Sequence, residues 1–463
     1  MNDEQLNQLG LKNEVDRRAF LKGASVSGLM MMMGGTVLVP TRPALGADAA
    51  ETKRPATPPL KCGIIGCGAW GRDLINTLGQ LPNAPITAMC DTYGAYLRRA
   101  ARSAPDSKQY EDYTQLLADE NVEAVFIATP THLHRPMVEA ALKAGKHVYC
   151  EAPLAQTSED AKAIALAARG ATKLYFQSGL INRSEPQRRF LLDFIRTGAW
   201  GKTVMARLQF HKKQSWRRSS SSPEQERAMN WRLDKTTSLG LIGELGIHQL
   251  DMASWFNHAR PKAVTGFGSI VKWADGRDVE DTVQAIFELE DGSSLMYDAT
   301  LANSFDADYE MYYGTDAALM VRESKAWMFK EVDAPLLGWE VYARKDSFYK
   351  EVGIALVANA SKPTTTSDKP EAEAAYTNAP LKYALEAFIS NAFNHGQAVK
   401  DFKESFGEDD AALADYLKDL ESKRLPAAGY KEAFEATVLV IKANEAIQAR
   451  KRIELKPEWF ELT

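Results

Sequence analysis

Residues 61–71 read KCGIIGCGAWG, a short apolar run that passes directly into a glycine-rich turn. The spacing of Gly66, Gly68 and Gly71 is typical of the turn that joins the first strand to the first helix of a dinucleotide-binding fold. In such a turn the first glycine allows the tight bend, the second lets the backbone approach a pyrophosphate, and the third lets helix and strand pack closely. The stretch therefore predicts a Rossmann-type nucleotide-binding domain.

The second part of this signature lies at the end of the next apolar run, 86–90. There Asp91 provides a carboxylate that can accept both hydroxyls of an adenosine ribose. Its negative charge would repel a 2′-phosphate, so the sequence predicts NAD as the cofactor and disfavours NADP. Ala69 and Trp70 belong to the same predicted site, because they begin the helix whose free N–H groups bind phosphate.

Apolar runs continue along the chain and alternate with helix-length segments. Because the runs are fully apolar, they predict a parallel sheet covered by helices on both faces. One of the intervening helices is bounded by Pro136 in its first turn and by Gly145 after its last residue. The runs expected to form strands are 62–66, 86–90, 124–128, 147–150 and 173–176.

The pattern changes after residue 198, where strand-like segments dominate. The tetrapeptide Glu-Asp-Gly-Ser at 290–293 lies between two apolar runs and predicts a hairpin. The Ser-rich tract 218–222 is expected to be a flexible loop without a chemical role, and 397–425 a charged helical insertion on the surface. The strand-like segments are 202–210, 262–273, 281–301 and 309–321.

The composition is that of a soluble globular enzyme, with 45% hydrophobic and 25% charged residues in a chain of 463. This length predicts two or three domains. The formal net charge is −5 and no basic stripe is visible, so we expect no nucleic-acid partner. All four cysteines fall between Cys62 and Cys150 and are expected to be small buried hydrophobes, because their irregular spacing does not suggest a metal site.

Residues 1–47 have the layout of a twin-arginine (Tat) signal peptide. Two adjacent arginines precede a modestly apolar run at 23–39, and small residues follow at 44–47. The alternative is a single membrane anchor, which the glycines within the run disfavour. We therefore expect export to the periplasm, and a Pro-rich, extended arm at 48–60 after the signal peptide.

Five further stretches carry recognisable motifs: ATPTHLHRPMVEAALKAGKHV (128–148), EAP (151–153), QSGLINRSEPQRR (177–189), GELGIHQLDMASWF (243–256) and AFEATVLVIKANEAIQARKRIEL (433–455). Together with the glycine turn they resemble the glucose–fructose oxidoreductase/inositol dehydrogenase (Gfo/Idh/MocA) family over nearly the whole chain after residue 61. The resemblance implies an α/β protein with a Rossmann NAD-binding domain at 61–178. It also implies an α/β domain at 179–463, whose large, mostly antiparallel open sheet binds substrate and forms a homo-oligomer, a dimer or tetramer. The closing helix is expected at 429–449.

The resemblance also implies which residues meet the cofactor. Family members carry Glu-Lys-Pro at the end of a strand, and the lysine exchanges a proton with the sugar hydroxyl beside the nicotinamide. This chain has Ala152 at that position, which can neither donate nor accept a proton. Glu151 is expected to be structural, and Pro153 to lie against the nicotinamide. The turn at 128–134 is expected to contribute Thr129, Pro130, His132 and His134 near the cofactor.

The catalytic candidates come from the GELGIHQLD motif, in which an acidic residue and a histidine four positions later point into the site in the family. Here these residues are Glu244 and His248, which would share one face of a helix. Histidine is well suited to proton transfer near neutral pH. The alternative for His248 is a buried, hydrogen-bonded side chain. Substrate contacts are expected from Arg183 and from Trp231 and Arg232, although the last two would serve equally as loop anchors.

Export restricts the chemistry, because no NAD pool exists outside the cytoplasm. The main hypothesis is an exported NAD-dependent oxidoreductase that acts on a sugar or a sugar-derived polyol and regenerates a tightly bound cofactor in each cycle. The first alternative is a redox-neutral, NAD-dependent glycoside hydrolase, in which oxidation, elimination, hydration and reduction follow one another. The second alternative is a catalytically silent sugar-binding protein that retains NAD.

Overall fold

The computed structural model describes residues 57–257, 259–323, 325–338, 340, 343, 345–348, 351–356 and 379–463. The predicted signal peptide and residues 48–56 of the predicted arm lie outside these residues. The described chain packs as two compact units. The described residues of Pro55–Glu185, Arg207–Asp308 and Asn378–Thr463 form one unit, and those of Pro186–Ala206 and Tyr309–Thr377 form the other.

The first unit contains a parallel sheet of six strands in the order β3-β2-β1-β4-β5-β6. Four apolar runs form strands as predicted. The run at 173–176 was placed too early, because Leu174 lies in a turn and the strand begins at Phe176. β3 was missed, since it is three residues long and mostly exposed. The strands are β1 (Cys62–Ile65), β2 (Ile86–Cys90), β3 (Lys108–Tyr110), β4 (Ala124–Ile127), β5 (His147–Cys150) and β6 (Phe176–Ser178).

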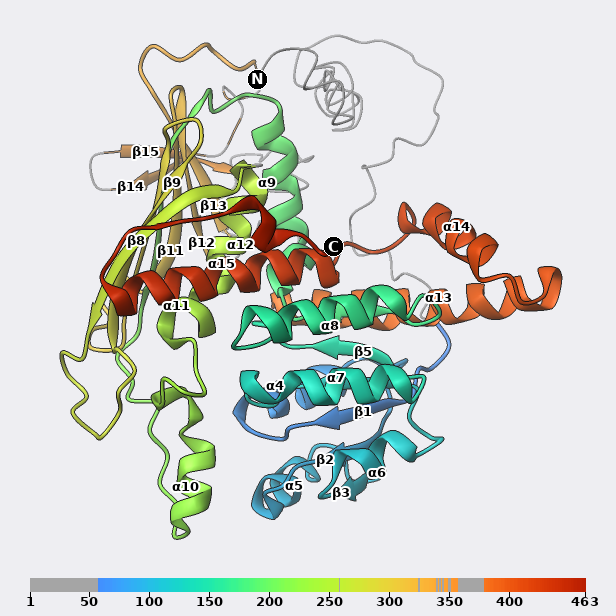
Figure 1. Cartoon of the computed structure of the whole chain (residues 1–463). Helices are drawn as coiled ribbons and strands as arrows, with labels where there is room; N and C mark the ends of the chain where they lie inside the picture. Colours follow the sequence, from blue (N-terminus) through green and yellow to red (C-terminus); the bar gives the residue numbers. More distant parts are fainter. Residues whose placement is uncertain are drawn as a thin grey trace, which may run out of the picture. The chain divides into compact units, whose positions relative to one another are not determined.

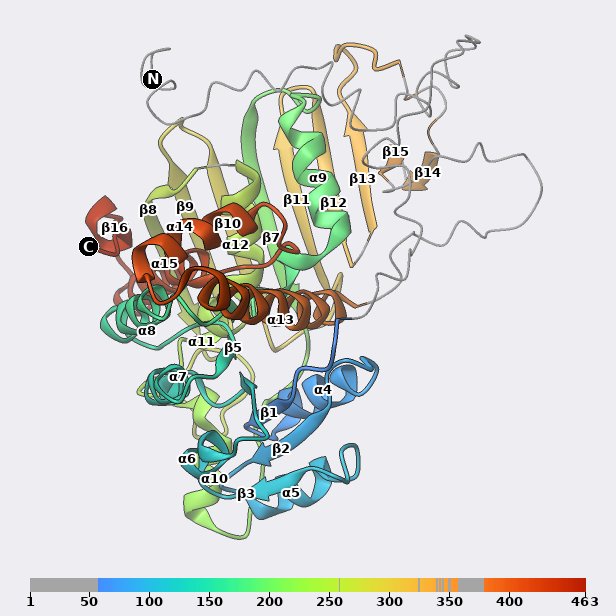
Figure 2. The same ribbon diagram turned by 90° about the vertical axis from the view of Figure 1, so that its right-hand side faces the viewer.

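Helices cover both faces of this sheet, as the apolar strands predict (Figures 1 and 2). Leu74 from the first helix and Phe388 from a helix near the C-terminus join Phe126 of β4 in one hydrophobic core. The helices between the strands are α4 (Ala69–Leu78), α5 (Gly94–Ala100), α6 (Tyr113–Ala118), α7 (His134–Lys143) and α8 (Ser158–Gly170). All four cysteines are free and buried, as predicted.

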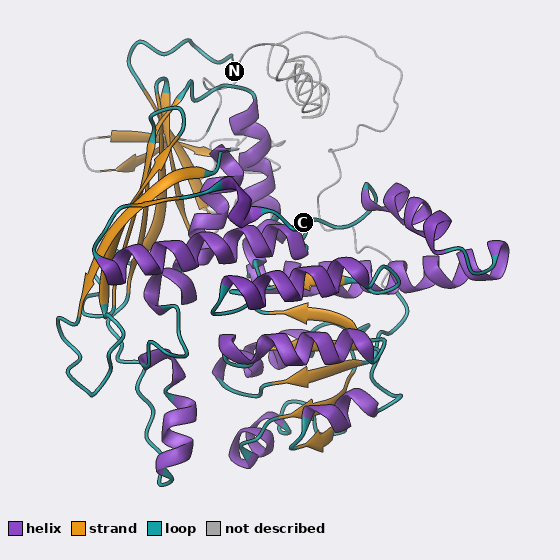
Figure 3. Cartoon of the chain, viewed as in Figure 1, coloured by secondary structure: helices purple, strands orange, loops and turns teal. Residues whose placement is uncertain are grey.

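The second sheet has ten strands in the order β14-β15-β13-β12-β11-β7-β10-β9-β8-β16, and the pairings described in detail are antiparallel. Figure 3 draws the strands of both sheets in orange. The predicted hairpin is confirmed by the pairing of β9 with β10. The segment 309–321 forms two strands joined by a turn. The strands are β7 (Thr203–His211), β8 (Pro261–Ser269), β9 (Thr282–Leu289), β10 (Ser294–Thr300), β11 (Asp308–Gly314), β12 (Ala317–Arg322), β13 (Lys325–Lys330), β14 (Lys345–Phe348), β15 (Glu351–Leu356) and β16 (Ile453–Glu454).

The remaining helices place the predicted site motifs. A cluster of short helices precedes the GIHQLD segment, and the closing helix agrees with the prediction. The predicted insertion at 397–425 begins inside the long helix α13, and the helix that lies wholly within it is α14. None of the helices in the described ranges is both long and apolar enough to cross a membrane. The helices are α9 (Pro186–Arg196), α10 (Pro223–Met229), α11 (Gly240–Glu244), α12 (Gly246–Asn257), α13 (Pro380–Phe406), α14 (Asp410–Glu421) and α15 (Tyr430–Ala449).

Candidate active site

The glycine turn has the geometry that a dinucleotide site requires. Gly66 has a φ of +97°, which L-residues with a Cβ rarely adopt. A Cβ on Gly71 would overlap the carbonyl oxygen of Gly66, so the helix packs directly on the turn. In front of Gly68 no heavy atom lies within 4 Å of a Cβ position, so the backbone is open to a ligand there. Helix α4 begins at Ala69 without a side-chain cap, and its first N–H groups are left to bind phosphate.

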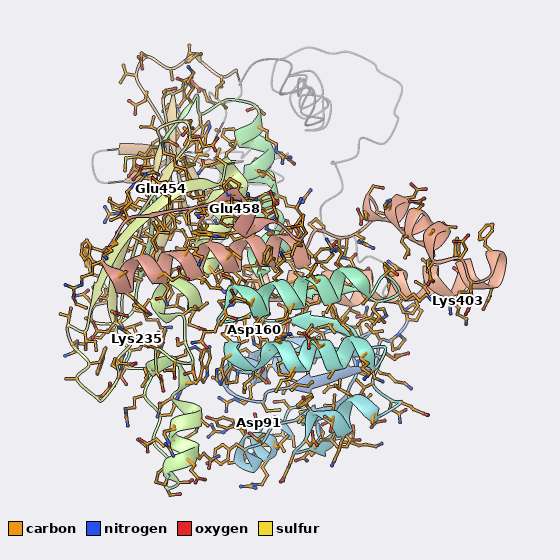
Figure 4. All side chains as sticks on the ribbon, in the orientation of Figure 1. Asp91, Asp160, Lys235, Lys403, Glu454 and Glu458 are labelled. Atoms are coloured by element: carbon orange, nitrogen blue, oxygen red, sulfur yellow. The ribbon has the colours of Figure 1, made fainter. Side chains whose placement is uncertain are left out.

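Asp91 follows β2 and closes the other side of this turn. Its Oδ2 accepts a hydrogen bond from the Cys67 N–H at 2.7 Å, and its Oδ1 accepts one from the Tyr93 N–H at 2.8 Å. Burial raises the pKa of Asp91, and these two donors oppose that rise. Each oxygen keeps a second lone pair, which a ribose hydroxyl can use. Figure 4 labels Asp91 beside α5. The open turn and this carboxylate together fit NAD.

His134 joins the turns that follow β4 and β5. Its Nε2 lies 3.0 Å from the carbonyl oxygen of Thr129, and its Nδ1 lies 3.1 Å from that of Pro153 and 3.2 Å from that of Leu154. Burial lowers the pKa of the imidazole to about 4. The ring is therefore neutral at physiological pH and is held by backbone on both sides. The ring thus ties these two turns together, and Pro130 lies in the first of them, directly before the 3₁₀ turn that leads into α7.

Glu151 ends β5 as a buried carboxyl. It accepts a hydrogen bond from the indole of Trp70, and its Oε1 has no partner among the described residues. Burial raises its pKa to about 8, because no cation among the described residues pairs with it. The predicted structural role thus rests on a contact with the phosphate-binding turn. The following peptide bond, between Ala152 and Pro153, is cis.

Glu244 gathers residues from three separate segments. Its side chain is only 3% exposed, and its oxygens lie 3.2 and 3.4 Å from the hydroxyl of Thr131, which follows β4. The guanidinium of Arg232 lies 3.9 Å away, and the Leu239 N–H donates to Oε1 at 3.3 Å. Burial raises the pKa of Glu244, and Arg232 opposes this rise. Sequence reasoning missed Thr131, although it lies within the quoted TPTHLH turn.

Trp231 and Arg232 lie next to this carboxylate in a short 3₁₀ helix. The Arg232 guanidinium lies 4.4 Å from the Trp231 ring centre and 6.0 Å from that of Trp216. The Trp231 ring is in turn 6.2 Å from His132. An indole, a guanidinium and a carboxylate are the groups that stack on and hydrogen-bond a sugar. Trp216 had no role in the sequence analysis.

His248 lies on a different helix from Glu244. The spacing predicted that Glu244 and His248 share one face of a helix. The chain leaves helical geometry at Leu245, so the two residues lie on separate helices. His248 as a whole residue is half-buried, but its ring Nδ1 is enclosed without a partner among the described residues. Burial lowers its pKa to about 4, so the imidazole is neutral and able to accept a proton at physiological pH.

Arg183 is held by a carboxylate that the sequence analysis did not single out. Its Nε and Nη2 each lie 2.8 Å from an oxygen of Asp251, which is 3% exposed. The guanidinium also lies 5.1 Å from the ring centre of Trp255. This forked ion pair joins the segment after β6 to α12, one turn beyond His248. Arg183 therefore orients the helix that carries His248, and only its remaining nitrogen is left for a substrate.

Comparison with known proteins gives two family models and several relatives. An oxidoreductase family model with an NAD-binding Rossmann fold matches residues 60–178, and a model of the Gfo/Idh/MocA C-terminal domain matches residues 189–320. A glycosyl hydrolase family 109 protein of Shewanella amazonensis is 34% identical over 159 residues, which is 32% of this chain and 35% of that protein.

An inositol 2-dehydrogenase of Corynebacterium glutamicum is 27% identical over 234 residues, which is 50% of this chain and 64% of that enzyme. The match thus spans less than two thirds of either curated relative. The structure of a levoglucosan dehydrogenase in complex with NADH and levoglucosan has a TM-score of 0.61 and 19% identity, and covers 85% of this chain and 99% of its own. At this identity the likeness is one of fold. The two family models together match more than half of the chain, which therefore belongs to the Gfo/Idh/MocA family of NAD-binding oxidoreductases.

Proposed function

We propose that this protein is an NAD-dependent oxidoreductase that acts on a sugar or a sugar-derived polyol. The observation that carries the proposal is the Glu244 cluster. It joins the turn after β4, next to the nucleotide-binding glycines, to the indole and guanidinium of Trp231 and Arg232. A polar, aromatic wall beside a dinucleotide site suits a polyhydroxylated substrate. The inositol 2-dehydrogenase relative supports the same substrate class.

The division of work among the residues follows from their contacts. NAD, when bound, supplies hydride acceptance and return. Arg232 and Glu244 hold substrate hydroxyls, because one donates and the other accepts hydrogen bonds. His248 takes the hydroxyl proton, since Ala152 carries no titratable group and the neutral His248 ring can accept it. Its low pKa means that the proton must be passed on rather than kept.

A redox-neutral glycoside hydrolase is the second candidate. The glycosyl hydrolase family 109 relative favours it, although the match covers only about a third of that protein. Such a cycle would return the hydride to the substrate after a leaving group is eliminated and water is added. The cofactor would then need no second substrate. A silent sugar-binding protein that retains NAD is the third candidate and predicts no turnover.

One experiment separates these candidates. The purified protein is incubated with a panel of sugars, polyols and aryl glycosides, and absorbance at 340 nm and aglycone release are followed together. A change at 340 nm, with an oxidised product by mass spectrometry, supports the oxidoreductase. Aglycone release without net absorbance change supports the hydrolase. No turnover on any compound, with NAD bound, leaves only the silent protein.

Export and cofactor retention belong to the same proposal. The Tat-like N-terminus suggests the periplasm, where a released cofactor could not be replaced. We therefore expect NAD(H) to co-purify with the protein and to survive dialysis. A denatured sample whose supernatant holds no dinucleotide would count against retention. Fusing residues 1–47 to a reporter that needs the Tat pathway tests export, and failure of the reporter to leave the cytoplasm would refute it.

Self-association is proposed through the second sheet. On β8, β9 and β10, one face packs on helices, while the other presents Thr265, Ile286 and Met296 in register. Phe267 and Ile286 on this face are 56% and 48% exposed. An exposed apolar row of this kind suits a second copy of the chain. Light scattering should show a dimer or tetramer, and Ile286→Glu should lower the mass; a monomeric wild type would refute it.

A further inference from the structure

The segment 216–233 lies in contact with both ends of the predicted cofactor site. Near the adenosine end, the sulfur of Met229 lies 3.2 Å from the hydroxyl of Tyr96, which is on α5, five residues beyond Asp91. At the other end, Arg232 reaches the Glu244 carboxylate. The segment therefore follows the ligand-facing edge of the first sheet, from the ribose-binding aspartate to the catalytic candidates.

This segment is preorganised by its own hydrogen bonds. The Arg218 N–H donates to Oδ1 of Asn230 at 2.7 Å, and Nδ2 of Asn230 donates to the Arg218 carbonyl at 2.8 Å. Arg217 forms an ion pair with Glu226 at 2.8 Å. Ser222 caps α10 by accepting from the Gln225 N–H. Residues 218–222 have no regular secondary structure, in agreement with the predicted loop, and these contacts tie the loop to α10.

The backbone of Trp216 is held in an unfavourable conformation within this segment. Its φ is +63°, a left-handed conformation that costs a bulky residue about 1–2 kcal/mol. That backbone turn places its ring beside Arg232, 6.0 Å from the guanidinium. Residues held in such conformations gather at binding sites more often than elsewhere.

Arg217 and Arg218 differ in whether their guanidinium groups have partners. The guanidinium of Arg217 is occupied by Glu226 and by the Asp275 carbonyl. The Arg218 side chain is exposed and forms no ion pair with a described residue. Burial raises the pKa of Tyr96, and the nearby positive charge of Arg218 is the largest influence that lowers it. Because the Arg218 backbone is hydrogen-bonded to Asn230, and the adjacent Met229 contacts Tyr96, this cation lies near the adenosine end of the predicted cofactor site.

We propose that Arg218, from its place near Tyr96, binds the pyrophosphate of the dinucleotide, and that the braced segment 216–233 slows release of the cofactor. The proposal rests on the proposed function, because it assumes that NAD occupies this groove and is retained there. It assigns to residues outside the Rossmann motif a share of cofactor binding. The ligand class is a phosphate-bearing dinucleotide.

The test measures the binding of NADH and of NADPH to Arg218→Gln and to the wild type. Energy transfer from protein tryptophan to the bound nucleotide reports the binding. Release rates come from displacing the bound nucleotide with excess NAD. We expect the dissociation constant for NADH to rise about tenfold to a hundredfold, since a charged hydrogen bond is lost. Arg218→Lys should recover part of the affinity. Arg102→Gln is the control, because it makes the same charge change at an exposed side chain outside the segment 216–233.

Each outcome has a separate meaning. A similar loss for NADH and NADPH supports a pyrophosphate contact, whereas a loss confined to NADPH would place Arg218 on the 2′-phosphate and overturn the assignment. Wild-type affinity and release in Arg218→Gln would also overturn it. A wild-type protein that binds no dinucleotide would instead refute the proposed function.

Discussion

The carboxylate of Glu151 fills the space directly beside the backbone of Gly179: a Cβ at position 179 would overlap Oε2 of Glu151. The two residues follow β5 and β6, which are neighbours in the first sheet. The absence of a side chain on Gly179 thus makes room for an acidic group that reaches the indole of Trp70 in the glycine turn. In this way a buried acid couples the strand ends to the phosphate-binding turn.

This burial predicts an unusual pH dependence for Glu151. Its pKa rises from 4.5 to about 8 in the folded chain. A carboxyl with a raised folded-state pKa stabilises the fold below pH 4.5, and this contribution is lost as the pH rises to about 8. Glu151→Gln removes the titration. The difference in unfolding free energy between wild type and variant should shift against the wild type by at most about 1.4 kcal/mol per pH unit across this window. Urea unfolding at several pH values measures it; parallel curves would contradict it.

Substitution of Gly179 tests the same contact between Gly179 and Glu151. Gly179→Ala should lower the unfolding free energy by about 1–3 kcal/mol, because the methyl group forces the Glu151 carboxylate or the strand end to move. NAD affinity should fall as well, since Trp70 loses its partner. Gly170→Ala is the matched control, because a Cβ there meets no atom within 4 Å. A Gly179→Ala protein as stable as this control would contradict the prediction.

The buried His395 predicts that the free energy of unfolding falls at acidic pH. The pKa of His395 is lowered to about 4 by burial and by Arg424. Its Nε2 lies 3.0 Å from the Thr172 carbonyl, while Nδ1 faces Arg424 at 3.1 Å, so the neutral form is fixed. A depressed pKa gives stability above pH 6.5 that is lost as the pH falls towards 4.

His395→Gln should therefore flatten the acid side of the stability curve. The wild type is expected to lose up to about 1.4 kcal/mol per pH unit more than the variant between pH 6.5 and 4. Denaturant unfolding of both proteins at matched ionic strength measures the two slopes. Equal slopes would show that the pKa of His395 is the same in the folded and unfolded chain and would contradict the prediction.

Asp91 predicts which substitution loosens the cofactor. Asp91→Ala removes the acceptor of two backbone N–H groups and of the ribose hydroxyls. We expect the NADH dissociation constant to rise about tenfold or more, and the preference for NAD over NADP to shrink as the charge disappears. Titration with both nucleotides measures the two effects. An unchanged NAD affinity would mean that the ribose does not bind at Asp91.

Local patterns were sufficient to predict the first sheet and its glycine turn. Fully apolar runs of four or five residues mark buried parallel strands because both faces are covered. β3 escaped this rule, since Lys108 and Gln109 are exposed at the edge of the sheet. The break at Leu245 was not predicted either, although Gly243 and Gly246 flank it and glycine disfavours a continuous helix. Only the packing of two short helices shows it.

The site could be predicted in part, and mainly where a motif carries its own chemistry. Asp91 and Glu244 were predicted because a strand end and a family motif mark them. Asp251 and Met229 were not, because their partners Arg183 and Tyr96 lie far away in sequence and no periodicity relates them. Ala152 was recognised as a departure, yet the raised pKa of its neighbour Glu151 depends on burial that no sequence pattern reports.

Ala152 leaves two alternatives: a site that lacks its usual base, or a site adapted to another reaction. Substitution of His248 tests which group moves the proton. His248→Asn keeps a hydrogen-bonding side chain and removes the titratable ring. General acid–base catalysis contributes about 10²–10⁴-fold, so kcat should fall by that order while bound NAD is unchanged. Arg183→Gln frees Asp251 and disturbs the helix of His248, and should lower kcat less. Full activity in His248→Asn would show that another group moves the proton.

Ala152→Lys gives the complementary result. In a site that merely lacks a base, the lysine restores a proton carrier and should raise the rate of hydride transfer from a simple sugar to NAD in a stopped-flow measurement at 340 nm. In a site adapted to a different reaction, an ammonium next to the buried Glu151 would pair with it, lower its pKa and withdraw it from Trp70. Turnover and NAD affinity should then both fall. Ala152→Met is the control, because it adds similar length without charge. Equal losses in the two variants would trace the effect to bulk, and a gain in Ala152→Lys alone would trace it to the proton.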